Sequence, residues 1–181
     1  MNLPNKITVF RIIMIPFFVF ALLGDFPLHE PLALLLFVVA AASDAVDGHI
    51  ARSRNLITDF GKFMDPLADK LLVCSAFICL IELQMMPSWI VIIVIAREFA
   101  ITGLRTLAAS DGIVIAASKW GKLKTISQMV AIVTLLLYNC PISQIPILGV
   151  LGTIMIYIAM ILTLISGVDY LLLNKGVFRT M

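Results

Sequence analysis

Long runs of apolar residues, separated by short polar segments, follow one another along the whole chain. The runs that we expect to form helices are residues 7–23, 31–50, 66–83, 87–108, 126–138 with an extension to about Gln144, and 147–173. About 20 helical residues cross a hydrocarbon core of roughly 30 Å. A single such run could be the core helix of a soluble protein, but six in succession leave too little polar sequence to cover them. The pattern predicts an all-α, polytopic membrane protein with six transmembrane helices.

Composition agrees with this interpretation. Hydrophobic residues make up 61% of the 181 residues and charged residues only 13%, against about 25% charged residues in an average soluble domain. No linker or low-complexity tract interrupts the pattern, so we expect residues 1–181 to be one transmembrane domain. We expect membrane lipids, and no nucleic acid, among its partners.

The basic residues are distributed unevenly between the two sets of connections. The connections at 24–30, 82–86 and 139–146 contain neither Lys nor Arg, whereas the alternate connections and both termini contain nearly all of them. Because cytoplasmic loops carry the excess of Lys and Arg, both termini are predicted to be cytoplasmic. The predicted location is the cell (inner or plasma) membrane.

Two predicted helices carry acidic residues where they approach the cytoplasm. Asp44, Asp47, Gly48 and Ala51 have the spacing i, i+3, i+4, i+7, which places them on one helix face. Asp65 and Asp69 lie one turn apart on the next helix, with Gly61 and Lys62 one turn before them. A short connection between the two helices can bring these faces together.

Four carboxylates in one place repel each other. Two of them about 5 Å apart cost roughly 3 kcal/mol at an effective dielectric constant near 20. Protonation, pairing with basic side chains or a divalent cation could compensate, and a set of oxygen ligands suits Mg²⁺ or Mn²⁺ best. Gly48 and Ala51 would then leave room for a ligand beside the acids, although close helix packing is an alternative role for small residues.

The whole acidic segment resembles the signature of the CDP-alcohol phosphotransferase family. The matching residues are Asp44-x2-Asp47-Gly48-x2-Ala51-Arg52-x8-Gly61-x3-Asp65-x3-Asp69. The resemblance extends to the layout of six helices. It implies transfer of a phosphatidyl-type group from a CDP-linked lipid to an alcohol with release of CMP, and a homodimer.

The resemblance also implies roles for individual residues. Asp44, Asp47, Asp65 and Asp69 would bind two divalent cations, Mg²⁺ or Mn²⁺, and Asp69 would also be the catalytic general base. The residues implied to bind the CDP-lipid are Asn5, Thr8, Asp44, Gly48, Ala51, Arg52, Gly61 and Lys62. The active site would face the cytoplasm.

Three further segments are similar to the branch of this family that forms phosphatidylglycerol phosphate. They are residues 2–8 with Arg11, residues 96–99 with Arg105, and residues 119–125. They imply glycerol 3-phosphate as the acceptor. The residues expected to bind its phosphate are Arg97, Arg105, Lys119, Lys122 and Lys124.

The basic residues differ in what we expect of them. Arg97 lies about halfway along its helix, where an arginine usually pairs with an acid. Glu98 is expected to point elsewhere, so the expected partner is an aspartate or the bound substrate. The lysines are expected to be exposed, and their alternative role is that of an ordinary cytoplasmic loop near lipid headgroups.

The sequence leaves two other functions open. The same chemistry could use serine, an inositol phosphate or phosphatidylglycerol as the acceptor. A cation transporter could instead use the aspartates to coordinate its passenger ion. A transporter would not require Arg52 or a basic cytoplasmic site.

The uneven distribution of basic residues generates a prediction about topology. In a cysteine-free background, single cysteines at Asp25, Glu82 and Ser143 should react with an impermeant thiol reagent added outside the cell. Cysteines at Arg54, Ser118 and Thr180 should react only after the membrane is opened. The reverse labelling pattern would contradict the predicted orientation.

Overall fold

The computed structural model describes residues 2–53, 59–110, 118–143 and 145–174. Within these ranges, the side chains of residues 3–4, 45–53, 59–60, 62–63, 110 and 142 lie outside the description. The described part is all-helical and contains no strand. Its helices are α1 (Leu3–Leu23), α2 (His29–Ser53), α3 (Asp59–Glu82), α4 (Ser88–Ser110), α5 (Lys119–Asn139), a short 3-10 turn η1 (Pro141–Ser143), and α6 (Pro146–Leu173).

The helices occur where the apolar runs predicted them, but several ends differ: α3 begins at Asp59 and α5 at Lys119, each seven residues before the predicted start. The predicted extension to Gln144 is wrong, because the α-helix ends at Asn139 and the 3-10 turn follows. Pro141 explains this end, since proline lacks the N–H that a helix needs and disfavours helical backbone in the residue before it. Two helical segments, Asn5–Leu23 and Pro146–Leu173, are long and apolar enough to cross a membrane.

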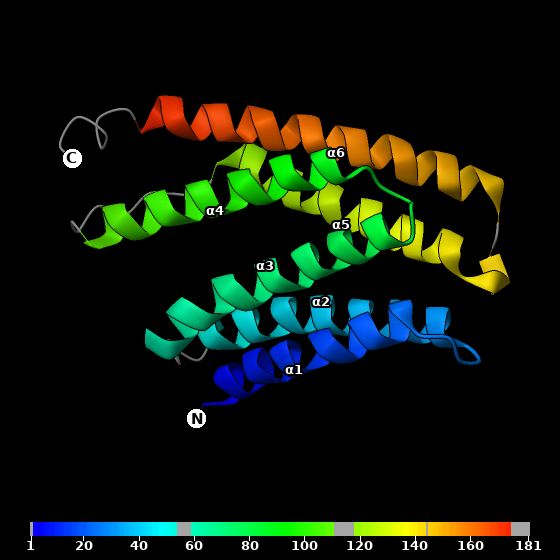
Figure 1. Cartoon of the computed structure of the whole chain (residues 1–181). Coiled ribbons are helices and arrows are strands. Elements are labelled where there is room, and N and C mark those ends of the chain that lie inside the picture. The colour runs from blue at the N-terminus through cyan, green and yellow to red at the C-terminus, as the bar shows by residue number, and fades with distance from the viewer. Residues whose placement is uncertain (1, 54–58, 111–117, 144, 175–181) are drawn as a thin grey trace.

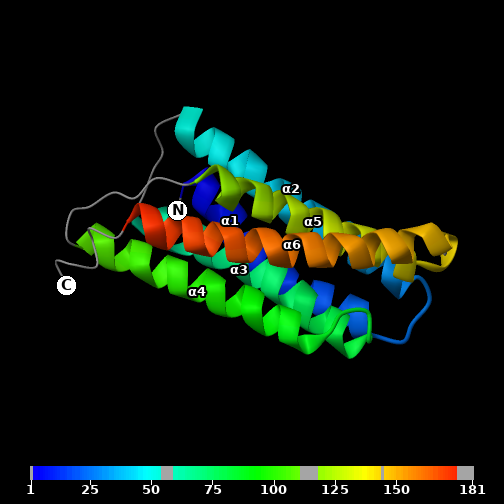
Figure 2. The same ribbon diagram turned by 90° about the horizontal axis from the view of Figure 1, so that it is seen from above.

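The helices pack side by side into an elongated bundle (Figures 1 and 2). α1 contacts α2 and α3, α5 packs along α6, and α4 contacts α3 and α6. At one end of the bundle lie the start of α1, the end of α2, the start of α3 and the end of α6 (Figure 1). We call this end the motif end, because the acidic segment of the sequence lies there.

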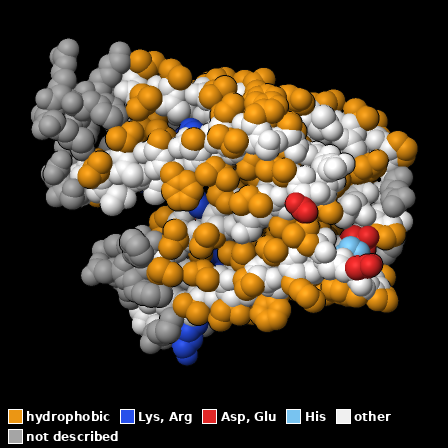
Figure 3. Space-filling model, viewed as in Figure 1, with side chains coloured by type: hydrophobic (Ala, Val, Ile, Leu, Met, Phe, Trp, Pro, Cys, Tyr) orange, Lys and Arg blue, Asp and Glu red, His pale blue; other side chains and the backbone are white. Residues whose placement is uncertain are grey.

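Apolar side chains form the interior and also cover most of the outside. Phe18 of α1 and Phe37 of α2 are completely buried, with ring centroids 5.6 Å apart. Outward-facing apolar residues include Phe17 and Phe20, which are 59% and 69% exposed. Figure 3 shows such side chains spread over the visible face, with few charges among them. An apolar exterior of this extent is typical of a surface that contacts lipid or another protein.

Small residues bring α5 and α6 into close contact. A Cβ atom added to Gly152 of α6 would lie 2.5 Å from Cδ2 of Leu135 on α5, and one added to Gly149 would lie 3.0 Å from the ring of Tyr138. Leu135 is only 2% exposed, so its side chain has little space into which to move. Glycine is therefore required at position 152 for the helices to approach this closely.

Replacing Gly152 should destabilise the protein. Overpacking of this kind costs about 1–3 kcal/mol, so Gly152→Val should lower the thermal unfolding midpoint in detergent. Gly103→Val is the matched control, because a Cβ at Gly103 of α4 has nothing within 4 Å. Equal midpoints for the two variants would show that the contact between α5 and α6 does not limit stability.

Candidate active site

Two buried side chains of α1 bind two acids of the motif, one on α2 and one on α3. Arg11 is completely buried, and its Nη1 donates a hydrogen bond to Oδ1 of Asp44 on α2 at 2.6 Å. Its Nε also donates to Oγ of Ser43 at 3.3 Å. Thr8, likewise completely buried, donates its hydroxyl hydrogen to Oδ1 of Asp65 on α3 at 2.6 Å. One helix thus holds carboxylates of its two neighbours.

The spacing along α1 explains how one helix reaches both partners. Asn5, Thr8 and Arg11 are three residues apart, so they lie along one face, and all three are buried. Sequence reasoning assigned Asn5 and Thr8 to the CDP-lipid and gave Arg11 no partner. The signal that it missed is this row of polar residues in an otherwise apolar helix.

Asp44, Asp65 and Asp69 are described with their side chains, and all three are partly buried. The side chain of Asp44 on α2 is 46% exposed. Asp69 interacts electrostatically with Asp44 and, as opposite charges, with Lys70, Arg11 and Lys124. The described acids of the motif therefore share one region at the motif end.

The predicted metal ligands can be compared with this arrangement only in part. The side chain of Asp47 lies outside the description, as do those of Gly48, Ala51, Arg52 and Lys62, and Gly61 is buried near the start of α3. Among the described side chains, no three acids, histidines or cysteines lie close enough together to hold a metal ion. The described donors are carboxylate oxygens, and this chemistry fits Mg²⁺ or Mn²⁺.

A second polar cluster joins α4, α5 and α6. Oε1 of Glu98 on α4 accepts hydrogen bonds from Nη1 of Arg97, at 3.1 Å, and from Nζ of Lys124 on α5. Nη2 of Arg97 also donates to Oγ of Ser166 on α6. We call these four residues the Glu98 cluster. It contains two of the five residues predicted to bind the acceptor phosphate.

The Glu98 cluster corrects two expectations. Glu98 was expected to point away from Arg97, but it is the acid that pairs with it. Residues i and i+1 of a helix point in different directions, and this was the basis of the expectation. The arginine side chain is long enough to bend toward the adjacent Glu98 all the same. Lys124 was expected to be exposed, but it is only 4% exposed. It lies more than one turn inside α5, and its ammonium group pairs with Glu98 of α4.

The remaining predicted phosphate ligands are at the surface. Lys119 and Lys122, in the first turn of α5, are exposed as expected, and so is Arg105 near the end of α4. The predicted residues therefore divide into an exposed group and a buried pair. The electrostatic interaction between Lys124 and Asp69 links the buried pair to the acids of α3.

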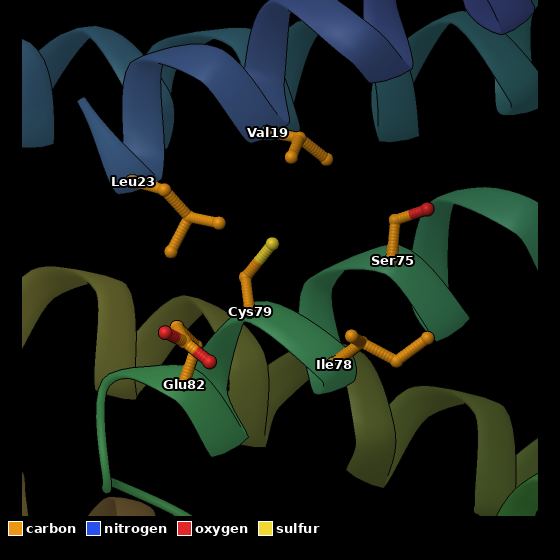
Figure 4. Close-up of a pocket in the computed structure, with 6 residues that line it drawn as sticks. All are labelled: Val19, Leu23, Ser75, Ile78, Cys79 and Glu82. Carbon is orange, nitrogen blue, oxygen red and sulfur yellow. The ribbon is translucent and has the colours of Figure 1, made fainter.

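A separate pocket of about 240 Å³ lies between α1 and α3 (Figure 4). Its lining is mostly apolar and contains none of the predicted site residues: Val19, Leu23, Ser75, Ile78, Cys79 and Glu82. These α3 residues begin six positions after Asp69, which is about 9 Å along a helix. The pocket is therefore distinct from the acidic motif.

This distribution of charge suits two substrates that carry different kinds of phosphate, a diphosphate on one and a phosphate ester on the other. Carboxylates with divalent cations can neutralise a diphosphate, and a nearby carboxylate can accept a proton from a hydroxyl group. Buried and exposed cations on the facing helices can bind a phosphate ester through charge-assisted hydrogen bonds. The site can thus bring an alcohol bearing a phosphate to a nucleotide-linked phosphate.

Residues 1–165 match the CDP-alcohol phosphatidyltransferase family, and the chain belongs to this family. The family membership predicted from the acidic motif is thereby confirmed. The family is generally dependent on divalent metal ions and associated with membranes.

Curated relatives resemble nearly the whole chain. A Bacillus subtilis (strain 168) protein named CDP-diacylglycerol–glycerol-3-phosphate 3-phosphatidyltransferase is 41% identical, over 99% of this chain and 98% of its own. A Rickettsia felis protein of the same name is 38% identical, over 98% and 97% respectively. A Mycobacterium tuberculosis protein named probable phosphatidylglycerophosphate synthase is 40% identical, over 93% and 79%.

The buried contact between Arg11 and Asp44 generates a prediction about stability and activity. Arg11→Met removes a hydrogen bond to a charged group, which is worth about 1.5–3 kcal/mol, and leaves Asp44 without this partner. We expect a lower unfolding midpoint and turnover reduced at least about tenfold. Lys6→Met is the matched control, because Lys6 is an exposed cation on the same helix. Equal effects of both substitutions would contradict a specific role for the Arg11 contact.

Proposed function

We propose that this protein transfers the phosphatidyl group of CDP-diacylglycerol to glycerol 3-phosphate, forming phosphatidylglycerol phosphate and CMP. The family match and the names of the curated relatives support the reaction and both substrates. The structural feature that carries the proposal is that Asp69 on α3 interacts electrostatically both with Asp44, which Arg11 binds, and with the buried Lys124 of α5.

In this proposal Asp69 accepts the proton of the acceptor's hydroxyl group. The hydroxyl oxygen forms a bond to the phosphorus of the phosphatidyl group, and the bond from that phosphorus to the CMP oxygen breaks. Asp44, Asp47, Asp65 and Asp69 would hold two divalent cations, Mg²⁺ or Mn²⁺, which supply charge neutralisation for the diphosphate when bound. Arg11 and Thr8 orient Asp44 and Asp65 through the contacts described above.

The two substrates would occupy different sides of Asp69. On the side of α1–α3, the proposed CDP-lipid site comprises Asn5, Thr8, Asp44, Gly48, Ala51, Arg52, Gly61 and Lys62. On the side of α4–α6, Arg105, Lys119 and Lys122 would attract the anionic acceptor from water, and Arg97 and Lys124 would bind its phosphate inside. This division places the residues proposed to bind the acceptor phosphate on α4 and α5, and the proposed metal ligands on α2 and α3.

The membrane arrangement is part of the proposal. Residues 1–181 would form one domain with six transmembrane helices, both termini in the cytoplasm, in the cell (inner or plasma) membrane. The apolar exterior and the presence of both the start of α1 and the end of α6 at the motif end support it (Figures 1 and 3). The active site would then face the cytoplasm, and the protein would function as a homodimer.

Product analysis tests the proposed reaction. The purified protein, given labelled glycerol 3-phosphate, CDP-diacylglycerol and Mg²⁺, should form labelled phosphatidylglycerol phosphate and an equal amount of CMP. Excess EDTA should abolish both products, and added Mg²⁺ should restore them. Labelled product from serine, an inositol phosphate or phosphatidylglycerol instead would identify another acceptor. No release of CMP with any acceptor would favour a cation transporter.

Two carboxylate variants of α3 control this experiment. Asp69→Asn should retain CDP-diacylglycerol binding while turnover falls by about 10² or more, as expected for loss of a general base. Glu82→Gln alters an exposed carboxylate at the far end of the same helix and should leave turnover unchanged. Loss of lipid binding in Asp69→Asn would show that Asp69 acts mainly as a ligand.

A further inference from the structure

The carboxylate of Glu98 is shared by two buried cations from different helices. The side chains of Arg97, Glu98 and Lys124 are 14%, 11% and 5% exposed. Charged side chains are almost never buried this deeply unless they are paired. The same oxygen, Oε1, accepts both hydrogen bonds, so it holds the guanidinium and the ammonium close to one point.

Arg97 is also fixed from the side of α6. Its Nη2 bonds to Ser166, and a Cβ atom added to the next residue, Gly167, would lie 3.3 Å from its Cγ. The arginine side chain therefore passes directly over a glycine of α6. Lys124 has no comparable second anchor among the contacts described, and its flexible four-carbon chain depends on Glu98 for its position.

The charges of the Glu98 cluster do not cancel. Two cations and one carboxylate leave one net positive charge inside the bundle. Nε of Arg97 and the hydroxyl of nearby Tyr170 are, in addition, buried polar atoms without a hydrogen-bond partner in the described part of the chain. Buried polar atoms are normally hydrogen-bonded. The residual charge and the unused donors both suit an anionic ligand.

We propose that Glu98 is a positioning residue for the phosphate of the acceptor. It keeps Lys124 inside the bundle, beside Arg97 and within electrostatic reach of Asp69, and leaves the Glu98 cluster itself with a net positive charge. The inference rests on the proposed function, because it concerns the acceptor of that reaction. Glu98 itself is anionic and acts through Lys124; without it, the ammonium would move toward the water that solvates Lys119 and Lys122.

Glu98→Gln tests this role, since it removes the charge and preserves the side chain's size. We expect the KM for glycerol 3-phosphate to rise about tenfold or more, as for loss of one charge-assisted contact. The KM for CDP-diacylglycerol and the kcat at saturating glycerol 3-phosphate should each stay within about threefold, as expected when only ground-state binding is lost. Glu82→Gln, an exposed carboxylate elsewhere, should change none of these values.

A double-mutant cycle with Lys124→Met shows whether Glu98 acts through the lysine. If it does, adding Glu98→Gln to Lys124→Met raises the KM for glycerol 3-phosphate by much less than Glu98→Gln does alone. Independent, multiplicative effects would contradict the proposal. Glu98→Asp retains the charge on a shorter side chain and should give a smaller, equally selective rise. If Glu98→Gln does not fold, Glu98→Asp provides the test. A selective rise in its KM for glycerol 3-phosphate would support the proposal, and no such rise would contradict it.

Other outcomes overturn the inference and leave the proposed reaction intact. Equal increases in KM for both substrates, or a lower unfolding midpoint with unchanged kinetics, would make Glu98 a structural residue. A decrease in the KM for glycerol 3-phosphate would show that its carboxylate competes with the substrate's phosphate. Failure of the unsubstituted protein to form phosphatidylglycerol phosphate would instead refute the proposed function itself.

Discussion

The buried contact between Arg11 and Asp44 is the constraint on which the motif end depends. A completely buried guanidinium requires an anion, and Asp44 of α2 supplies one through its hydrogen bond to Arg11. The pair therefore holds the end of α2 against α1, and the bond from Thr8 to Asp65 holds α3 against the same helix. Acids that would repel each other are kept together by a helix that contributes no metal ligand of its own.

The apolar exterior determines where the remaining charges can lie. Because outward-facing positions are occupied by residues such as Phe17 and Phe20, charged side chains must be at the motif end, in the outer connections or inside the bundle in pairs. The Glu98 cluster is such a set of paired charges in the interior, and its Lys124 interacts electrostatically with Asp69. A carboxylate that interacts with both sets of charge would suit the proposed reaction between two substrates.

The two sets of charge are compensated to different degrees. Arg11 offsets part of the negative charge of the motif, and divalent cations would be needed for the rest. Glu98 offsets one of the two cations beside it, which leaves a positive charge. In the proposed reaction, a diphosphate with metal ions and a phosphate ester without them would therefore find different environments within the same bundle. This difference gives a physical basis for binding two phosphorylated substrates in the correct places.

The sequence by itself determined the helices and the acidic motif. Their periodicity is local, since apolar runs and the i, i+3, i+4 spacing of Asp44, Asp47 and Gly48 can be identified without knowing any neighbour. Pro141 also carried the signal for the end of α5, which the apolar run obscured. Tertiary structure alone decided that Thr8 binds Asp65, that Glu98 joins Arg97 to Lys124, and that Lys124 is buried. These contacts join residues up to 57 positions apart, and flexible side chains have many possible partners until helix packing brings one within reach.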